Sequence, residues 1–412
     1  MSTGPLRDPF HALFGQTPTS ALAPESPEEA QEIVRWSAGK SIVPWGGGTR
    51  QALGHAPVGY DVCLSTAGLD RITDHQPADL TVTAQAGVTV ARLQETLAAH
   101  GQFLPLDIAR PDLQTVGGVV AARADSLRRL GLGSVRDALL GVTVLNSRGE
   151  WVKGGGKVVK NVSGYDLPKL YCGSLGTLGL IVEATFKVAP LPPASATALL
   201  PLPADHNTED VLDTLLGSDL SPAFLFLLNP GTARSVLPGA DDEHQYIVVG
   251  FDGPAEAVAW QVETLGAGAL DAGQADALRA RLRDFALDPA PMTASFHILS
   301  SQVGAYVRMA EWTARRAGFA ARVAADAALG LVHAHFAPAR PRPDWPAFYA
   351  DLKDKAARVG GSFVIERMPD VLRAADVPIW LPLLPDFALM RRLKQTLDPD
   401  GMWNPGRFVG GI

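Results

Sequence analysis

Glycine-rich stretches are the parts of this 412-residue chain best suited to hold an anion through the backbone. They are residues 43–49, residues 107–118 and the longer segment 153–192. Glycine accepts backbone conformations that other residues resist, so these stretches can bring N–H groups close to a ligand. Thr115 adds a helix start, where the helix dipole favours phosphate. Together the three stretches predict one nucleotide site.

Two common nucleotide-binding motifs are absent from the sequence. No G-x-G-x-x-G opens a helix in a βαβ unit with an acidic residue about twenty positions later, which disfavours a Rossmann NAD site. The G-x-x-x-x-G-K-[ST] pattern is missing as well, which excludes the P-loop NTPases.

His333 and His335 are weak candidates for acid–base catalysis. They lie two residues apart in the apolar run 331–336, so a strand would place both on one face. An imidazole can take a hydroxyl proton near neutral pH, or bind a metal. A structural role is the more common fate of such a pair, and both interpretations stay open, as they do for His297. No metal site is predicted.

The elements that must position these residues change character near Pro192. Before it, Ser26 and Glu29 predict a capping box for a helix to about residue 38, and Thr89 predicts a second helix. Alternating apolar residues over 80–86 predict a half-buried strand. Further strands are predicted at 42–45, 62–64, 138–146, 151–153 and 180–188.

The second half predicts two passes of a β-α-β-β-α order, which is the ferredoxin-like arrangement. Its predicted strands are 223–228, 246–251, 294–299, 320–324, 331–336 and 362–366. Its predicted helices are 209–216, 255–265, 303–317 and 345–358, and a last helix follows at 387–397.

Composition places the chain among globular proteins. Hydrophobic residues make up 47% and charged residues 19%, and the net charge of −7 argues against nucleic acid or an anionic membrane as partner. Cys63 and Cys172 stand apart, which disfavours a disulfide scaffold or an iron–sulfur cluster. We expect a cytoplasmic protein without a secretory signal or membrane span, whose association with the inner membrane, if any, comes through partners.

Four ordered motifs resemble one family. The glycine loop at 43–49, TVGG, GSVRDALLGVTVLNSRGE with KNVSGYDLPKLYCGSLGTLGLI, and the terminal DPDGMWNPGR look like the FAD-binding oxidoreductases of the vanillyl-alcohol oxidase (PCMH) superfamily. Within it, the chain most closely resembles the FAD-binding E subunits of bacterial glycolate oxidases (glycolate dehydrogenases). The resemblance is strong over 22–192 and 386–408.

The resemblance implies an α+β fold, in which a PCMH-type FAD-binding domain of two α/β lobes is joined to a ferredoxin-like α+β cap domain. The domains expected are an N-terminal extension at 1–21, the FAD-binding domain at 22–192, the cap at 193–370, and a C-terminal segment at 371–412 that returns to the FAD domain.

The resemblance also implies a set of residues that contact FAD. They are Pro44, Trp45, Gly46, Gly47, Gly48, Thr49, Pro105, Leu106, Thr115, Gly117, Gly118, Gly131, Ser134, Asp137, Gly179, Ile181, Val182 and Asn404. Lys160 and Asn161, among glycines beside Tyr165, are added as groups that could neutralise pyrophosphate or a reduced flavin. Thr49 and Arg50 stand where covalent members carry histidine, so the FAD is expected to be non-covalent.

The implied function is that of an FAD-binding redox subunit in a complex that oxidises glycolate, a 2-hydroxy acid, to glyoxylate. Its expected partners are a second flavoprotein subunit and an iron–sulfur subunit. The related dehydrogenases carry a histidine–glutamate constellation late in the cap domain, and no such H-G-E-H pattern occurs in this sequence. Two alternatives stay open: a self-sufficient FAD-dependent D-2-hydroxy-acid dehydrogenase using His333 or His335, and a catalytically silent scaffold subunit.

Overall fold

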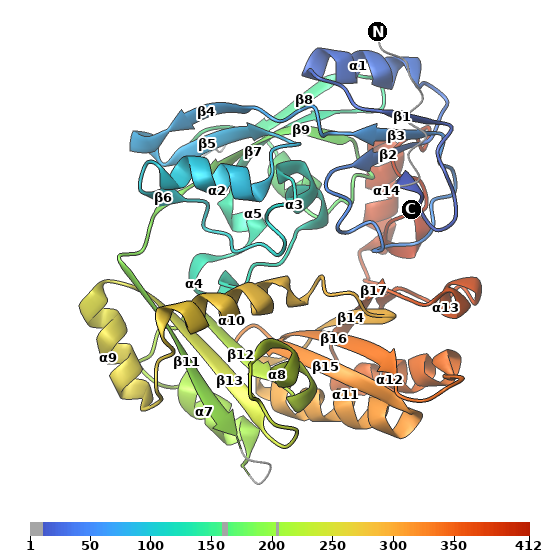
Figure 1. Cartoon of the computed structure of the whole chain (residues 1–412). Coiled ribbons are helices and arrows are strands. Elements are labelled where there is room, and N and C mark those ends of the chain that lie inside the picture. The colour runs from blue at the N-terminus through green and yellow to red at the C-terminus, as the bar shows by residue number, and fades with distance from the viewer. Residues whose placement is uncertain (1–10, 159–163, 203–205) are drawn as a thin grey trace. The chain divides into compact units, whose positions relative to one another are not determined.

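The computed structural model describes residues 11–158, 164–202 and 206–412 (Figure 1). By their internal contacts these residues form two units. Unit 1 contains the chain up to Ser126, Gly133–Leu191 and Leu383–Ile412, and unit 2 contains Leu127–Leu132 and Pro192–Pro382. Residues 371–382, expected in the C-terminal return, make their contacts in unit 2 because Leu372 and Ile379 pack into its core.

Unit 1 is built on three sheets. One is parallel with the order β1-β3-β2, one is antiparallel with the order β4-β5-β9-β7-β8, and β10 pairs with β6. The strands are β1 (Ser20–Leu22), β2 (Ile42–Trp45), β3 (Val62–Ser65), β4 (Ile72–Gln76), β5 (Thr81–Gln85), β6 (Gln102–Phe103), β7 (Leu139–Leu145), β8 (Trp151–Gly155), β9 (Leu180–Lys187) and β10 (Ala189–Pro190). The helices are α1 (Pro27–Trp36), α2 (Val90–Ala98), α3 (Val116–Ala122), α5 (Val135–Ala138), α6 (Leu167–Tyr171) and α14 (Phe387–Leu397).

Short polar side chains start the helices of unit 1. The side chains of Thr89 and Thr115 cap α2 and α3 as predicted. Ser26 Oγ accepts from Glu29 N at 3.1 Å and caps α1. The Glu29 carboxylate, however, accepts from Glu25 N at 2.9 Å rather than from the cap residue, so only half of the predicted capping box forms.

Strand β5 is buried along its whole length, so the prediction of a half-buried strand is wrong. Val82 and Ala84 face a hydrophobic core, as the alternation predicts. The polar residues of the strand are buried too, and at Thr83 a neighbouring strand supplies a hydrogen-bond partner. Thr83 Oγ1 lies 2.9 Å from Thr185 Oγ1. Alternation therefore marked the two faces correctly but not their exposure.

Unit 2 is an eight-stranded antiparallel sheet with the order β11-β13-β12-β15-β16-β14-β17-β18. The strands are β11 (Ala194–Leu202), β12 (Phe224–Leu228), β13 (Gln245–Gly253), β14 (Met292–His297), β15 (Phe319–Asp326), β16 (Leu331–Pro338), β17 (Ser362–Arg367) and β18 (Trp380–Leu381). The helices are α4 (Arg129–Leu132), α7 (Thr208–Leu216), α8 (Pro230–Val236), α9 (Ala255–Leu265), α10 (Ala272–Phe285), α11 (Val303–Ala317), α12 (Trp345–Val359) and α13 (Asp370–Ala374).

The order β14-α11-β15-β16-α12-β17 completes the predicted ferredoxin-like unit. The first pass forms the strands β11, β12 and β13, which lie in the order β11-β13-β12. Because β12 pairs with β15, the strands of the two passes form one sheet. Both faces of the sheet are covered: residues of α7, α9, α11 and α12 pack in one core, and residues of α8 and α10 pack in the other (Figure 1). Within the described residues, no helix has the length and apolar character needed to cross a membrane.

Candidate functional site

An open pocket lies in unit 1, where four chain segments meet. These are the loop after β2, the start of α3, the glycine run before β9, and the C-terminal tail. The lining residues are Pro44, Trp45, Gly46, Gly47, Gly48, Thr49, Arg50, Gln51, Thr66, Gln114, Thr115, Gly117, Gly118, Ala121, Ala122, Leu175, Gly176, Gly179, Leu180, Ile181, Asn404 and Arg407.

The glycine loop after β2 is packed against the segment that precedes α3. A Cβ on Gly46 would lie 2.5 Å from Thr115 Oγ1, and one on Gly47 would lie 1.8 Å from the Leu113 carbonyl oxygen. Gly48 has a φ of 72°, in the left-handed region. Because these glycines have no side chains, the backbone of the loop after β2 packs directly against the segment that precedes α3. The two segments together form one wall of the pocket.

The start of α3 contributes surface to the pocket rather than free N–H donors. Val116 N donates to Val88 O and Gly117 N to Ala86 O, both at 2.8 Å, and Gly118 N donates to Thr115 Oγ1 at 3.3 Å. The N–H groups that were expected to reach a ligand at this helix start are therefore already paired. The loop at 86–88 accepts from Val116 and Gly117, and the Thr115 side chain accepts from Gly118.

Two arginines give the pocket a positive charge. Arg50 and Arg407 are the charged side chains among the described lining residues, and no carboxylate is present in that set. Arg407 is buried, and its Nη2 donates to Gln51 O at 3.1 Å and Leu53 O at 2.7 Å. A concave site of one sign attracts an anion, and a pyrophosphate matches this charge.

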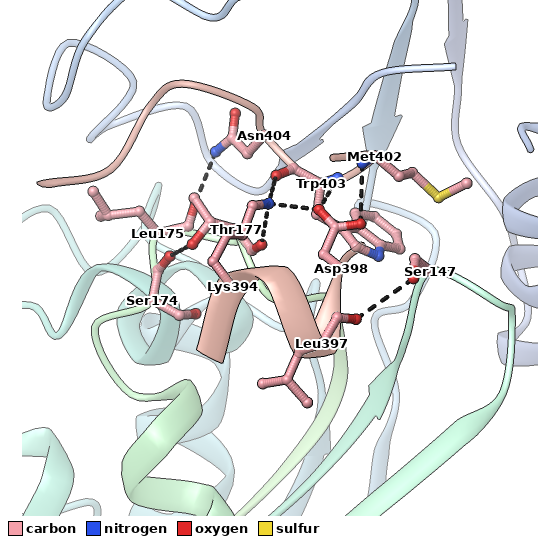
Figure 2. A network of polar contacts seen from close by, with 10 residues as sticks. All are labelled: Ser147, Ser174, Leu175, Thr177, Lys394, Leu397, Asp398, Met402, Trp403 and Asn404. Carbon is pink, nitrogen blue, oxygen red and sulfur yellow. Dashed lines mark hydrogen bonds and ion pairs between the residues drawn. The ribbon is translucent and has the colours of Figure 1, made fainter. Parts of the chain in front are cut away.

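Asn404 brings an unsatisfied acceptor to the pocket (Figure 2). Its Nδ2 donates to Leu175 O at 2.7 Å, which fixes the orientation of the amide because that carbonyl can only accept. Asn404 Oδ1 is buried without a hydrogen-bond partner, and the residue has a φ of 45°. A buried acceptor of this kind is costly unless a ligand supplies a donor. FAD carries such donors on its hydroxyl, amine and imide groups.

Many of the predicted contact residues meet in this pocket. They are Pro44, Trp45, Gly46, Gly47, Gly48, Thr49, Thr115, Gly117, Gly118, Gly179, Ile181 and Asn404. The residues predicted from sequence that do not line it are Pro105, Leu106, Gly131, Ser134, Asp137 and Val182. Lys160 and Asn161 lie outside the described residues.

The predicted residues that do not line the pocket have other surroundings. Ser134 and Asp137 form a capping box at α5, with Ser134 Oγ donating to Asp137 Oδ2 at 2.6 Å. Leu106 and Val182 are buried in hydrophobic cores. Gly131 belongs to unit 2, where its N–H donates to Ala223 O at 3.1 Å.

Several residues that line the pocket were not predicted from the sequence, although most of them lie within or next to the motifs quoted above. Gly176 lies within the glycine run, Arg407 ends NPGR, and Gln114 precedes TVGG. Gly176 has a φ of 68° and a Cβ there would lie 3.1 Å from Pro44 Cγ, which brings the run against the loop after β2. Cationic side chains beside an expected pyrophosphate were the signal that could have identified Arg407 and Arg50.

His333 and His335 lie on β16 in unit 2, on the same face as predicted, and both are buried. The His335 ring stacks on Phe285 with centroids 4.2 Å apart, and Arg322 Nη2 lies 3.3 Å from its Nδ1. Burial, together with the positive charge of Arg322, lowers the pKa of His335 to about 3. His335 is therefore a neutral, packed imidazole.

Two family models match three of the four segments that line the pocket, all but the glycine run before β9. Residues 18–155 match the FAD binding domain, and residues 385–408 match the C-terminal domain of FAD linked oxidases.

Curated relatives match about half of the chain. A D-2-hydroxyglutarate dehydrogenase of Xanthomonas citri pv. viticola is 32% identical over 238 residues, which is 56% of this chain and 50% of that protein. Glycolate oxidase subunit GlcD of Bacillus subtilis is 28% identical over 261 residues, 61% of this chain and 55% of that protein. Subunit GlcE of Escherichia coli is 39% identical over 125 residues, 30% of this chain and 36% of that protein. The chain thus spans about half, or less, of the length of these relatives.

Solved structures share the fold over most of the chain. An alkyldihydroxyacetonephosphate synthase has a TM-score of 0.71 at 19% identity, covering 94% of this chain and 76% of that one. The 4-ethylphenol oxidase of Gulosibacter chungangensis has a TM-score of 0.71 at 17% identity, covering 94% and 88%. With the matched models and the pocket, this likeness leads to one conclusion. The chain carries the FAD-binding domain and the C-terminal segment of the FAD-linked oxidases on an α+β fold of the PCMH type, and its cofactor is FAD.

Proposed function

We propose that this chain is an FAD-binding redox subunit of a complex that oxidises glycolate, a 2-hydroxy acid, to glyoxylate. The observation that carries the proposal is the pocket of unit 1, with its glycine walls, two arginines and the orphan acceptor of Asn404. Relatives named as glycolate oxidase subunits and D-2-hydroxyglutarate dehydrogenases support a 2-hydroxy acid as the substrate class.

The residues of the pocket divide the work of holding the cofactor. The loop at 44–49 lets the pyrophosphate approach the backbone, and Arg50 and Arg407 balance its charge. Asn404 Oδ1 accepts a hydrogen bond from the bound molecule. FAD bound there would supply the oxidising power, by taking a hydride equivalent from the carbon that bears the substrate hydroxyl.

The surroundings of His335 support a subunit role over a self-sufficient dehydrogenase. A general base works best with a pKa near the operating pH. Burial holds the pKa of His335 at about 3, and its ring is stacked on Phe285. His333 is buried on the same strand. His335, one of the two bases proposed in the self-sufficient alternative, therefore resembles a structural residue.

The proposed partners are a second flavoprotein subunit and an iron–sulfur subunit. Cys63 and Cys172 are the two cysteines of the chain, which is too few for a cluster held by four thiolates. GlcE and GlcD are both named as subunits, which supports an assembly.

Non-covalent FAD is part of the proposal. Thr49 and Arg50 occupy the glycine loop and line the pocket, and neither side chain is a usual attachment point for flavin. Precipitating the holoprotein with acid should release the flavin into the supernatant. A yellow pellet would contradict this part of the proposal.

Flavin absorbance of the purified chain tests the main proposal. Under anaerobic conditions, glycolate should leave the visible flavin band of the isolated chain unchanged and bleach it when the partner subunits are present. Bleaching of the isolated chain by glycolate, D-lactate or D-2-hydroxyglutarate would instead establish the self-sufficient alternative, which the names of several relatives favour. If the chain shows no flavin absorbance even after FAD is added, the remaining alternative is a catalytically silent scaffold subunit.

A further inference from the structure

A buried lysine lies behind the pocket wall in unit 1. Lys394, in α14, is 9% exposed, and its ammonium group donates to Asp398, to Thr177 O at 2.7 Å and to Trp403 O at 2.8 Å (Figure 2). An ammonium group has three N–H donors, and all three are used here. Burial lowers the pKa of Lys394, while the carboxylate of Asp398 opposes that effect.

Asp398 is saturated in the same way. It is 2% exposed, its Oδ1 accepts from Met402 N at 3.0 Å, and its Oδ2 accepts from Trp403 N at 2.9 Å as well as from Lys394. A buried charge pair is stable only when its remaining donors and acceptors are satisfied, and this pair meets that condition.

The pair joins three segments that are far apart in the sequence. Lys394 connects α14 to the glycine run through Thr177 and to the C-terminal tail through Trp403. The amide of Asn404 closes the connection by donating to Leu175 O. Leu175 and Asn404 both line the pocket, so the network ends at the surface that FAD would contact.

The network fixes the backbone on the N-terminal side of Asn404. Trp403 N is held by Asp398 and Trp403 O by Lys394, so the peptide that leads into Asn404 has little freedom. Asn404 itself has a φ of 45°, in the left-handed region that asparagine tolerates better than most other residues. Its Oδ1 is a buried acceptor of this network that the described protein does not satisfy.

We propose that Lys394 and Asp398 are positioning residues for FAD, which hold the tail and the glycine run so that Asn404 Oδ1 meets a donor of the cofactor. This inference rests on the assignment of the pocket to FAD. A purely stabilising role is a weak explanation of the pair, because a buried ion pair is often no more stabilising than well-packed apolar residues.

A double-mutant cycle on FAD binding tests the proposal. Apoprotein of the wild type, Lys394→Met, Asn404→Ala and the double variant is titrated with FAD, and quenching of flavin fluorescence gives the dissociation constant. Each single variant should bind about 10-fold more weakly, since one hydrogen bond is worth roughly that factor. The double variant should bind no more than about 2-fold more weakly than the weaker single variant, because residues in one network are not additive.

Lys355→Met is the matched control. Lys355 pairs with Asp351 four residues earlier, at 2.7 Å, on α12 of unit 2, so the same substitution removes a lysine from a similar pair. Its FAD dissociation constant should stay within about 2-fold of wild type. Asp398→Asn serves as a second variant if Lys394→Met does not fold, and it should also weaken FAD binding about 10-fold.

The outcomes separate this inference from the proposed function. If the wild type binds FAD but Lys394→Met and Asp398→Asn bind it equally well, the positioning role is refuted. Additive losses for Lys394→Met and Asn404→Ala refute it too, since a general loss of stability acts independently of Asn404. A wild-type chain that binds no FAD overturns the assignment of the pocket instead.

Discussion

Lys394 in unit 1 and His335 in unit 2 are both buried titratable groups, and burial lowers the pKa of each. Lys394 is surrounded by a carboxylate and two carbonyl oxygens, which suit a cation. His335 lies beside the Arg322 guanidinium and on the Phe285 ring, which suit a neutral imidazole.

Lys394 and His335 differ in the surroundings to which their contacts connect them. The contacts of Lys394 lead to the wall of a pocket and to an unsatisfied acceptor, whereas those of His335 lead into aromatic packing and the Arg322–Asp288 ion pair. A buried charge or a perturbed pKa is thus a poor sign of function alone. The informative sign is a polar network that leaves a buried acceptor without a partner on a residue that lines a pocket.

Gly47→Ala should have the largest effect on the pocket side of the comparison. The added Cβ would lie 1.8 Å from the Leu113 carbonyl, a backbone atom that cannot turn away, so the two walls must separate. Overpacking of about 3 kcal/mol corresponds to at least about 100-fold weaker FAD binding. Titration of apoprotein with FAD measures it.

Gly268→Ala is the control for that substitution, because a Cβ at Gly268 meets nothing within 4 Å. It should bind FAD as the wild type does. Equal FAD affinity in Gly47→Ala and wild type would mean that the loop after β2 is not part of the cofactor site.

Acid should expose the structural role of His335. Its pKa is about 3 in the folded chain and 6.5 in the unfolded chain, so between these values the unfolded chain binds a proton that the folded chain does not. The stability from this group is therefore complete above pH 6.5 and falls as the pH drops towards 3. The loss at pH 4 is about 3 kcal/mol. Urea unfolding at pH 7 and pH 4 measures it.

His335→Phe removes the titrating group and keeps a ring against Phe285. Its stability should fall less between pH 7 and pH 4 than that of the wild type, by the amount assigned to His335. Parallel pH profiles for the two proteins would show that the imidazole is not protected from protonation.

Arg50→Gln should weaken FAD binding about 10-fold, because a charge-assisted contact to a phosphate is lost from a pocket lined by two arginines. The dissociation constant should also depend less on salt than in the wild type. Measuring it at two salt concentrations tests both points. An unchanged salt dependence would place the Arg50 charge outside the phosphate contact.

Ser26→Ala should have the smallest effect. It tests whether a loss of stability in unit 1, away from the pocket, leaves FAD binding unchanged. Its hydroxyl caps α1 in unit 1 without lining the pocket, so about 1 kcal/mol of stability should be lost. The FAD dissociation constant should not change. A weaker affinity would show that any loss of stability in unit 1 affects the cofactor site, and would remove the distinction drawn for Lys394.

The sequence predicted most elements of both units because their signals are local. Thr89 and Thr115 cap helices where expected, and α14 has the predicted bounds of 387–397. Strand β4, strand β11 and helix α10 were not predicted. Residues 272–285 of α10 carry much charge, so their apolar stripe of Leu278, Leu282 and Phe285 was not recognised before the sheet that it covers was known.

Pocket residues could be predicted from the sequence where they belong to a recognised motif. Residues that reach the pocket only through contacts made by the fold could not. Motif glycines such as Gly46 and Gly117 do line the pocket. Lys394 was not predicted, because its role depends on Thr177, which lies 217 residues away in sequence. The burial of His335 was equally invisible, since the stacked Phe285 comes from another element. Pairwise contacts over such separations have no period or spacing to reveal them.

The return of the C-terminal tail has a consequence for biosynthesis. Asn404 and Arg407 line the pocket, and Trp403 forms a parallel bridge with Ile42 beside the small sheet. A nascent chain therefore lacks one wall of this pocket until residues 403–407 have been synthesised. A molecule truncated before Asn404 would lack this wall, so it should not retain a ligand that needs Asn404 and Arg407.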